Sequence, residues 1–578
     1  MAFYHSLPQV AEPGRRRQTC YILPFPTVRL HENPAMTPAP PPTAEAASSP
    51  GAPWSRPSVV VLGVVLMVGM WLGWLSRDAA LTVYGDDTTY LTLSYEIATG
   101  QYRDSFLVGA PPHAQYPPGM PLWLLLVRVL AGPSLDAVLA GNLLLVALTA
   151  LLVADGVRRV ATPWLGVTVA AMIMFNAPLF VLVAELRSEI PFLALAALAL
   201  WWSLKDSERT APGALTWLAL AAALAAFLTR SAGLALFPAV FGAMLLRRRW
   251  QALIAGGTMT LAVVVAWFSY TRWAAAQTVG HSYATDLAAG VSSASAPLLI
   301  EHLAANAKMY ILHLANAQFS IPDLPEQPLD NLLVGLFLAV PAAIGAWQVR
   351  KRWPALGLFL LGSVAILLAF SWPIRRLFTP LIPWVAAAML LGWSGLAAAA
   401  GVRRPHRVAV GLGLVLASLG LIHRAQAAVR EQGCRDSPPF VDPACYEVQY
   451  RSYASAVQYI RDSLPNTAVI AAVRPAFVHL STDRLTMPID LFERSAFEGL
   501  VAPQGPTTHI LLSKLYRLER RLGEGRLRDV CGSLALLKRY PAGTLLFEVR
   551  PSPTADLNAC DALDRYVQDR SDSLQTIP

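Results

Sequence analysis

The stretch YGDDTTYLTLSYEIATGQYRDSFLVGAPPHAQYPPGMP, residues 84–121, lies between two strongly apolar segments and sets the interpretation of the chain. Asp86 and Asp87 form a carboxylate pair just before a helix-like run that Gly100 ends. Five prolines, at 111, 112, 117, 118 and 121, then restrict the backbone. A bare connection between membrane helices does not need this much fixed backbone around two acids. We therefore predict that this segment holds the chemistry and that the rest of the chain positions it.

The composition indicates a membrane protein. Of 578 residues, 55% are hydrophobic and 14% are charged, whereas soluble domains carry roughly a quarter charged residues. Mean hydropathy is +0.44. Apolar runs of about 18 residues or more recur, as expected for helices that span a bilayer. The chain is therefore predicted to be a mainly α, polytopic membrane protein.

The apolar runs predict eleven spans. They lie at residues 58–76, 137–154, 164–184, 190–204, 214–229, 231–246, 250–271, 331–349, 353–373, 377–401 and 408–423. Residues 120–131 are too short to cross and include Arg128, so an interfacial helix is predicted there. The Pro-rich residues 1–57 are predicted to be a disordered tail, without the layout of a signal peptide.

The basic residues predict the orientation of the spans. Alternate loops carry most of the cations near span ends: Arg158, Arg159, Lys205, Arg209, Arg247, Arg248, Arg249, Arg350, Lys351, Arg352, Arg403, Arg404 and Arg407. By the positive-inside rule these loops and the N-terminus are cytoplasmic. The loops 77–136 and 272–330 and the region 431–578 are then outside the cell membrane. Because topology explains the net charge of +9, nucleic-acid binding is not expected.

Residues 431–578 have the composition of an exported α/β domain. A helix is predicted at Tyr450 to Leu464, and strands at Ala468 to Val473, His509 to Leu512 and Leu545 to Val549. Four of the five cysteines lie here, which favours disulfides over a zinc site. Local pairing would join Cys434 to Cys445 and Cys531 to Cys560, although spacing alone does not fix the connectivity.

Ionisable side chains avoid the predicted spans and gather at their outer ends. No Asp, Glu, Lys or Arg falls inside the spans as drawn, which argues against ion-coupled transport. The outer ends instead carry Asp86, Asp87, Glu185, Arg187, Glu189, Arg230, Arg375 and Arg376. Each of these could be a solvated loop residue, a helix cap or a headgroup anchor. Their coincidence on one face suggests a site.

Acids and arginines at a membrane face suit one kind of chemistry. A carboxylate can deprotonate an acceptor hydroxyl, and arginines can hold and stabilise a phosphate. A substrate with a phosphate at the interface and a long lipid tail is a polyprenyl-phosphate-linked sugar. The pattern therefore predicts sugar transfer on the outer face.

These residues resemble the motifs of the GT-C superfamily of integral-membrane glycosyltransferases, in the branch with protein O-mannosyltransferases and lipid A aminoarabinose transferases. GDDTTY at 85–90, ATGQY at 98–102 and YPPGMP at 116–121 carry the resemblance. It implies that Asp86 is the catalytic Asp, Asp87 its acidic neighbour and Tyr90 the motif's aromatic. Tyr116 stands where the aminoarabinose branch has a basic residue, and His113 lies nearby, so that sugar is not carried over.

Weaker matches follow in the family's order. LRSEIPF at 186–192 places Glu189 at a second acid, and LTRSAGL at 228–234 supplies Arg230. RRLFTPLIP at 375–383 favours Arg376 over Arg375. The resemblance implies a GT-C fold with a C-terminal α/β domain and inverting transfer from a polyprenyl-phosphate-linked donor. Asp86 would be the base, Arg230 and Arg376 would contact the phosphate, and Glu189 would assist. Glu185, Arg187, Tyr90, Tyr116 and His113 would line the cavity.

The resemblance implies no cofactor and no metal, with a divalent ion on Asp87 and Glu189 as the alternative. Two other functions stay open: a lipid-linked sugar flippase or exporter, and a receptor or assembly module in which the C-terminal domain acts alone. The sequence does not name the sugar, the polyprenol or the acceptor, which could be a protein, lipid or glycan.

Overall fold

A computed structural model describes most of the chain beyond the N-terminal tail. The described residues are 52–76, 86–209, 213–277, 296–319, 328–370, 375–430, 448–489, 506–515, 527, 530–550 and 557–568. The predicted tail to residue 51 and the proposed Cys434–Cys445 pair lie outside them. So does Gly85 of the acidic motif.

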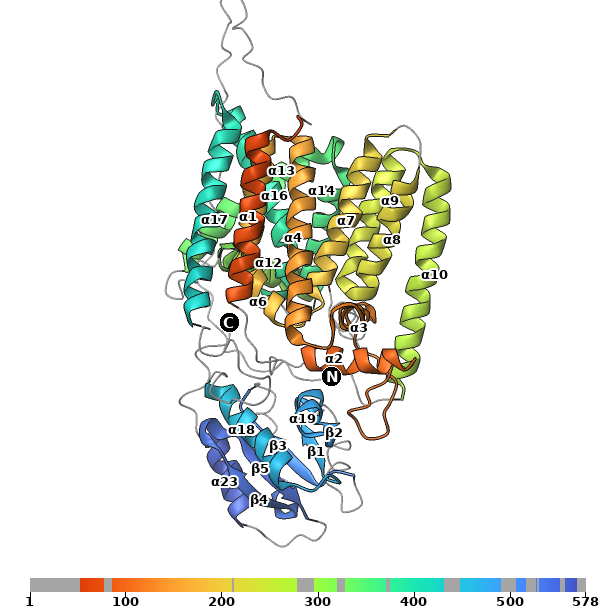
Figure 1. Ribbon diagram of the computed structural model, residues 1–578, viewed down its shortest axis with the longest axis vertical. Helices are drawn as coiled ribbons and strands as arrows, with labels where there is room; N and C mark the ends of the chain where they lie inside the picture. Colours follow the sequence, from red (N-terminus) through yellow and green to blue (C-terminus); the bar gives the residue numbers. More distant parts are fainter. Residues whose placement is uncertain are drawn as a thin grey trace, which may run out of the picture. The chain divides into compact units, whose positions relative to one another are not determined.

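Long apolar helices form the body of the described chain. Six are long and apolar enough to cross a membrane, and a bent pair would make a seventh. They are α1 (Arg56–Leu75), α4 (Leu135–Val160), α10 (Trp250–Ala275), α13 (Pro328–Gln348), α16 (Ile382–Ala399) and α17 (Pro405–Arg430). Figure 1 shows α1, α4, α7, α8, α9 and α10 side by side, and neighbours in this series pack together.

The other helices are shorter or less uniformly apolar. They are α2 (Asp86–Ala98), α3 (Gly119–Ala131), α5 (Pro163–Met174), α6 (Ala177–Ala184), α7 (Glu189–Ser207), α8 (Ala214–Thr229), α9 (Leu236–Leu246), α12 (Ala296–Phe319), α14 (Pro354–Ala369) and α15 (Arg375–Phe378). The 3-10 turns η1 (Ser231–Ala235), η2 (Val349–Lys351) and η3 (Thr379–Leu381) adjoin α9, α13 and α16. Helices thus cover the described part of every predicted span. The number of membrane crossings stays a prediction.

The predicted span at 164–184 is broken into α5 and α6, which meet at 57°. Asn176 explains the break, because its side chain accepts a hydrogen bond from the backbone N–H of Leu179 at 2.8 Å and so caps α6. Pro178 sits in the first turn of α6, where its missing N–H costs little.

A buried arginine stabilises this bend. Arg424 lies one residue beyond the predicted last span but within α17, and it is 1% exposed. Its guanidinium donates to the carbonyl oxygens of Gly69 at 3.2 Å and Met174 at 2.5 Å. It also covers the ring of Phe180 at 3.4 Å. The cation therefore joins α17 to α1 and to the end of α5.

The C-terminal region contains a five-stranded sheet in the order β2-β1-β3-β5-β4. The strands are β1 (Val469–Ala472), β2 (Leu485–Pro488), β3 (His509–Leu512), β4 (Leu534–Arg539) and β5 (Leu545–Val549). Strands β2, β1 and β3 are parallel, and β3, β5 and β4 are antiparallel. The three predicted strands are present, while β2 and β4 escaped prediction.

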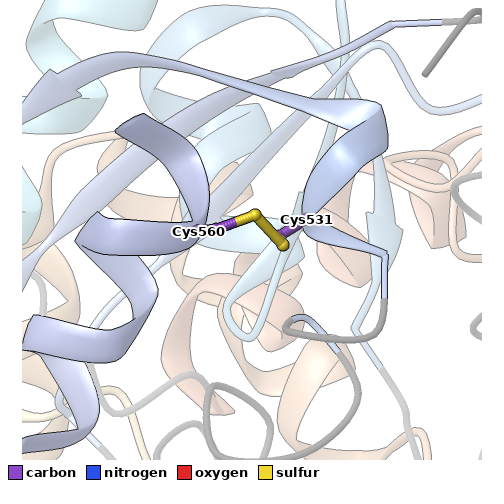
Figure 2. The surroundings of a disulfide bond; sticks show 2 residues. All are labelled: Cys531 and Cys560. Atoms are coloured by element: carbon purple, nitrogen blue, oxygen red, sulfur yellow. A yellow bond between two sulfur atoms is a disulfide. The ribbon is translucent and has the colours of Figure 1, made fainter. Parts of the chain in front are cut away.

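Helices cover both faces of this sheet. The residues of α18 (Val448–Ser463) and α19 (Pro475–Thr482) share one core with Ile470 and Leu511, and those of α23 (Leu557–Gln568) share another with Ile510 and Phe547. The disulfide Cys531–Cys560 fastens α23 to the short helix η6 (Cys531–Ser533), as Figure 2 shows. One of the two predicted local pairings is therefore confirmed.

The contact between α13 and α16 gives a test of the helical packing. A methyl group added at Gly392 would overlap the carbonyl oxygen of Pro341, so the two backbones touch as in close membrane-helix pairs. We expect Gly392→Ala to cost about 1–3 kcal/mol through overpacking and to lower the thermal midpoint of the purified protein. Gly411→Ala is the control, because nothing lies within 4 Å of its added methyl. Equal midpoints for the two variants would contradict this packing.

Candidate active site

The acid pair opens α2. Asp86 and Asp87 occupy the first turn, where unpaired backbone N–H groups and the helix dipole favour negative charge. Asp86 is 9% exposed and Asp87 is fully buried. Tyr90, one turn later, packs in a cluster with Tyr116 and residues of α3. The helix predicted at 120–131 is thus observed as α3, and it packs against the helix that carries the acids, while its interfacial position stays a prediction.

A fully buried carboxylate joins three separate parts of the chain. Glu189 begins α7 and has no exposed surface. Its Oε1 lies 2.9 Å from Arg230 Nη1 and 2.5 Å from Arg376 Nε. Arg230 ends α8, and Arg376 lies in α15. The structure therefore brings together the acid and the two arginines that the sequence singled out.

Arg376 also reaches the acid pair. Its Nη2 lies 2.6 Å from Asp86 Oδ2, and the other oxygen, Oδ1, accepts a hydrogen bond from the hydroxyl of Tyr116 at 2.7 Å. Arg376 thus bridges the two acids Asp86 and Glu189. The neighbouring side chain of Arg375 lies outside the described set.

The electrostatic surroundings keep Asp86 charged. Burial raises its pKa, but the charge of Arg376 and, after it, that of Arg187 lower the pKa more. The hydrogen bond from Tyr116 and the charge of Arg474 act in the same direction, so that the pKa of Asp86 lies below its ordinary value. The carboxylate is therefore available as a proton acceptor at neutral pH.

Glu185 and Arg187 form a buried ion pair with each other between α6 and α7. Burial raises the pKa of Glu185 to about 7, although Arg187 lowers it. Neither residue lines the two cavities of the described chain discussed below. Their predicted place on a substrate cavity stays a prediction. The charge of Asp87 also raises the pKa of Glu185, so the ion pair lies within electrostatic range of the acid pair.

An apolar cavity of about 120 Å³ lies beside the cluster. Its polar end holds Arg230 and Ser188, whose hydroxyl accepts from Arg230 Nη1 and from the Tyr90 hydroxyl, each at 3.2 Å. The remaining walls are mostly apolar and include Phe192, Leu234, Ile366, Leu367, Phe370, Leu377, Pro380 and Leu381. A cation at the end of an apolar cavity suits an anionic group attached to a hydrocarbon chain.

A second, larger cavity of about 730 Å³ has walls of mixed polar and apolar character. It is lined by Thr88 and Thr89 of α2, by the loop 103–116, and by the C-terminal segments 473–476 and 487–489. Tyr116 lines both cavities. Its hydroxyl donates to Asp86, so that this carboxylate is bonded to a residue shared by both cavities, although Asp86 is not among the residues that line either one.

The C-terminal region is attached to the loop that walls this cavity. The backbone N–H of Thr486 in β2 donates to the carbonyl oxygen of Phe106 at 2.9 Å, and that of Val108 donates to the carbonyl oxygen of Thr486 at 3.1 Å. The Thr486 hydroxyl adds a third bond, to Phe106 at 2.7 Å. The loop thus adds to the edge strand of the sheet.

Sequence reasoning missed three residues of this site, Ser188, Asp104 and Arg474, and it missed the hydrogen-bonding role of Tyr116, a residue that it did predict. Ser188 directly precedes Glu189 and could have been found from that position. Arg474 gave no signal, because it follows a strand almost 400 positions after Asp86 and only the fold brings its charge near that acid. His113, predicted near the substrate, lines the larger cavity and is 2% exposed.

The predicted metal alternative has little support in these side chains. In the part of the chain that the structure describes, no group of three or more His, Cys, Asp or Glu residues is arranged to hold a metal ion. Both oxygens of Glu189 already face Arg376, at 2.5 and 3.4 Å. The two oxygens would have to leave the guanidinium of Arg376 before they could bind a metal ion.

Fold and site together define a multi-pass membrane protein with acids and arginines gathered around two cavities. No protein-family model matches the chain, and no curated protein matches its sequence. Among solved structures, apo ArnT from Cupriavidus metallidurans matches with a TM-score of 0.51 at 13% identity, over 85% of this chain and 98% of ArnT. The predicted GT-C fold is confirmed by this match, which shows the fold alone.

Two further structures are similar to the chain. ArnT from the same organism bound to undecaprenyl phosphate matches with a TM-score of 0.48 at 14% identity, over 87% of this chain and 99% of ArnT. The oligosaccharyltransferase AglB from Archaeoglobus fulgidus, in complex with an inhibitory peptide and a dolichol-phosphate, matches with a TM-score of 0.49 at 12% identity. That alignment covers 79% of this chain and 70% of AglB.

The buried Glu185 predicts a pH dependence of stability. Its pKa is about 7 in the folded protein, against an ordinary value of 4.5 that applies to the unfolded chain. Between pH 4.5 and pH 7 the folded state therefore binds more protons than the unfolded state does. Stability contributed by this proton is present below pH 4.5 and is lost as the pH rises through 7. Glu185→Gln, which mimics the protonated side chain, should therefore gain thermal stability over the parent between pH 5 and pH 8. A constant difference between the two melting temperatures would contradict the assignment.

Proposed function

We propose that the protein is a glycosyltransferase that moves a sugar from a polyprenyl-phosphate-linked donor to an acceptor hydroxyl, with inversion. One observation carries the proposal. The charged carboxylate of Asp86 is hydrogen-bonded to Tyr116, which lines both an apolar cavity that contains Arg230 and a larger cavity of mixed polarity. This arrangement separates a lipid-linked donor from a hydrophilic acceptor and puts a base between them.

The apolar cavity supports a lipid phosphate as the donor's anchor. Arg230 provides a planar, permanently charged donor group that matches phosphate oxygens. Phe192 and Leu367 belong to the apolar walls along which a polyprenyl chain would lie. Undecaprenyl phosphate bound to ArnT is a ligand of the same chemistry in a protein of similar fold.

The polar side chains in the walls of the larger cavity support entry of the acceptor. Arg103, Asp104 and Gln115 line it, as does Arg474 from the C-terminal region. A glycan, peptide or headgroup fits such walls better than a hydrocarbon chain does. In this proposal the C-terminal region closes the acceptor side, since Thr486 ties it to the loop.

The proposed reaction is a single displacement. Asp86 takes the proton of the acceptor hydroxyl, and the oxygen attacks the anomeric carbon as the bond to the lipid phosphate breaks. Arg230 and Arg376 stabilise the charge that develops on the leaving phosphate. Before the donor binds, Glu189 pairs with both arginines, and Asp86 also pairs with Arg376. The leaving phosphate needs no proton, so one base is enough.

The site is proposed to face the outside of the cell membrane. The cations of the predicted inner loops support this orientation by the positive-inside rule. On the outer face sugars are carried by polyprenyl phosphates, which fits the apolar cavity. The N-terminus would then be cytoplasmic and the C-terminal region extracytoplasmic.

The base is tested by Asp86→Asn. Loss of a general base should lower transfer about 10²–10⁴-fold, while the binding of polyprenyl phosphate stays within about twofold. Transfer is measured in membranes from labelled lipid-linked sugars to cell-envelope glycans or proteins, analysed by mass spectrometry. Asp136→Asn, an exposed carboxylate in the first turn of α4, is the matched control. Full transfer by a correctly inserted Asp86→Asn protein would refute the assignment.

The donor anchor is tested separately by binding. Arg230→Ala removes a charge-assisted contact worth about 1.5–3 kcal/mol, so undecaprenyl phosphate should bind about 10–100-fold more weakly in native mass spectrometry. Arg128→Ala is the control, since Arg128 lies on the ring of Tyr95 at 3.8 Å and lines neither cavity. Equal affinities of the two variants for undecaprenyl phosphate would show that Arg230 does not bind the donor phosphate. Lipid transport without any sugar transfer would favour a flippase instead.

A further inference from the structure

The carboxylate proposed as the base is held at both of its oxygens. Arg376 holds Oδ2 at 2.6 Å, and the hydroxyl of Tyr116 holds Oδ1 at 2.7 Å. An arginine can follow an incoming phosphate, whereas a phenol on a packed ring stays in place. The orientation of Asp86 during the reaction therefore depends on what fixes Tyr116.

Tyr116 is fixed through its ring and through its backbone. The ring packs against Tyr90 at 4.8 Å and stacks on His113 at 5.4 Å, measured between ring centroids. Its backbone N–H donates to Nε2 of His113 at 2.8 Å, and its carbonyl oxygen accepts from the Tyr102 hydroxyl at 2.6 Å. Pro117 follows and restricts the backbone further.

The bond to Tyr116 determines the tautomer of His113. Because Nε2 accepts a hydrogen bond from a backbone N–H, the ring proton of the neutral imidazole must lie on Nδ1. That atom is 2.7 Å from Oδ1 of Asp104, to which it donates. Both side chains are buried, with His113 2% and Asp104 9% exposed.

Asp104 and His113 are themselves set in a closed loop. The backbone N–H of Asp104 donates to the carbonyl oxygen of Pro111 at 2.9 Å, and that of His113 donates to the carbonyl oxygen of Tyr102 at 3.0 Å. Arg103 and Pro112 form an antiparallel bridge between these bonds. The loop thus holds the His113 ring against the backbone of Tyr116.

We propose that Asp104 and His113 are positioning residues for the base: they fix Tyr116, whose hydroxyl orients the Asp86 carboxylate. The assignment of a base rests on the proposed function, and the chain of contacts does not. If the Asp104–His113 pair only stabilised the loop, substituting either residue would not change the titration of Asp86. The two cases are distinguished at Asp86 itself.

Several charged groups act on Asp86 from the elements around it. The charged groups are Arg376 from α15, Arg187 from the segment between α6 and α7, and Arg474 just before α19. The uncharged hydroxyl of Tyr116 acts as a hydrogen-bond donor. The arginines remain in every variant below. A change in the titration of Asp86 therefore reports on the hydrogen bond from Tyr116.

The experiment measures the titration of Asp86 in the purified full-length protein. A small apolar carbodiimide reacts with protonated carboxyl groups, and peptide mass spectrometry gives the extent of modification at Asp86 as a function of pH. Loss of a hydrogen bond to the charged form raises the pKa. We expect the midpoint to rise by about one pH unit in Tyr116→Phe and to rise by less in His113→Ala.

Further variants separate positioning from stability. Asp104→Asn keeps an oxygen that accepts from Nδ1 and should behave as the parent, whereas Asp104→Ala should resemble His113→Ala. Tyr95→Phe, on the exposed side of α2, is the matched control and should leave the midpoint unchanged. Asp86→Asn removes the signal and so identifies it. Thermal midpoints close to that of the parent show that each variant is folded.

The outcomes are distinct. An unchanged midpoint in Tyr116→Phe overturns the proposal. A shift in that variant without any shift in His113→Ala and Asp104→Ala would show that Asp104 and His113 do not position the base. The readout needs no transfer. If the shifts occur while the parent transfers no sugar from any lipid-linked donor, the proposed function fails and the positioning chain stands.

Discussion

The site depends on the ion cluster at Glu189. A fully buried carboxylate is costly unless cations and hydrogen-bond donors compensate it, and this one has Arg230 and Arg376 at 2.9 and 2.5 Å. The three residues belong to α7, α8 and α15, so the cluster fixes the places where these helices begin or end. The chain keeps two arginines beside an apolar cavity without leaving their charge uncompensated.

This constraint also suggests how a ligand would be accommodated. A phosphate that approached Arg230 and Arg376 would find cations already oriented by an acid, so little reorganisation would be required. Arg376 contacts both Glu189 and Asp86. Movement of this one side chain toward a phosphate would free one oxygen of the base while Tyr116 kept the other. Donor binding and activation of the base would then be linked through a single guanidinium.

Much of this architecture could be predicted from sequence because its signals are local. Apolar runs predicted helices over the spans, and composition separated the C-terminal α/β region. The short edge strands β2 and β4 escaped, since four to six residues with partly exposed patterns give little periodic signal. The order of weak motifs selected Asp86, Glu189, Arg230 and Arg376, which the structure brings together.

What escaped prediction depends on contacts between distant segments. The bond from Tyr116 to Asp86 spans 30 residues, and its geometry is set by a loop whose closure no periodicity reveals. The charge of Arg474 reaches the site because Thr486 pairs with the loop and α19 packs against α2. Arg424 had the appearance of a residue outside the last span, whereas the helix continues and buries it.

Arg424 has a consequence for the order in which the helices are assembled. Chains are made from the N-terminus, so α1 and α5 exist long before α17. Until then the carbonyl of Met174, at the bend between α5 and α6, lacks the guanidinium that binds it here, and an unsatisfied backbone group in an apolar environment is unfavourable. The last long apolar helix thus completes the packing of the first, and a nascent chain that ended before Arg424 would leave this carbonyl oxygen without its donor.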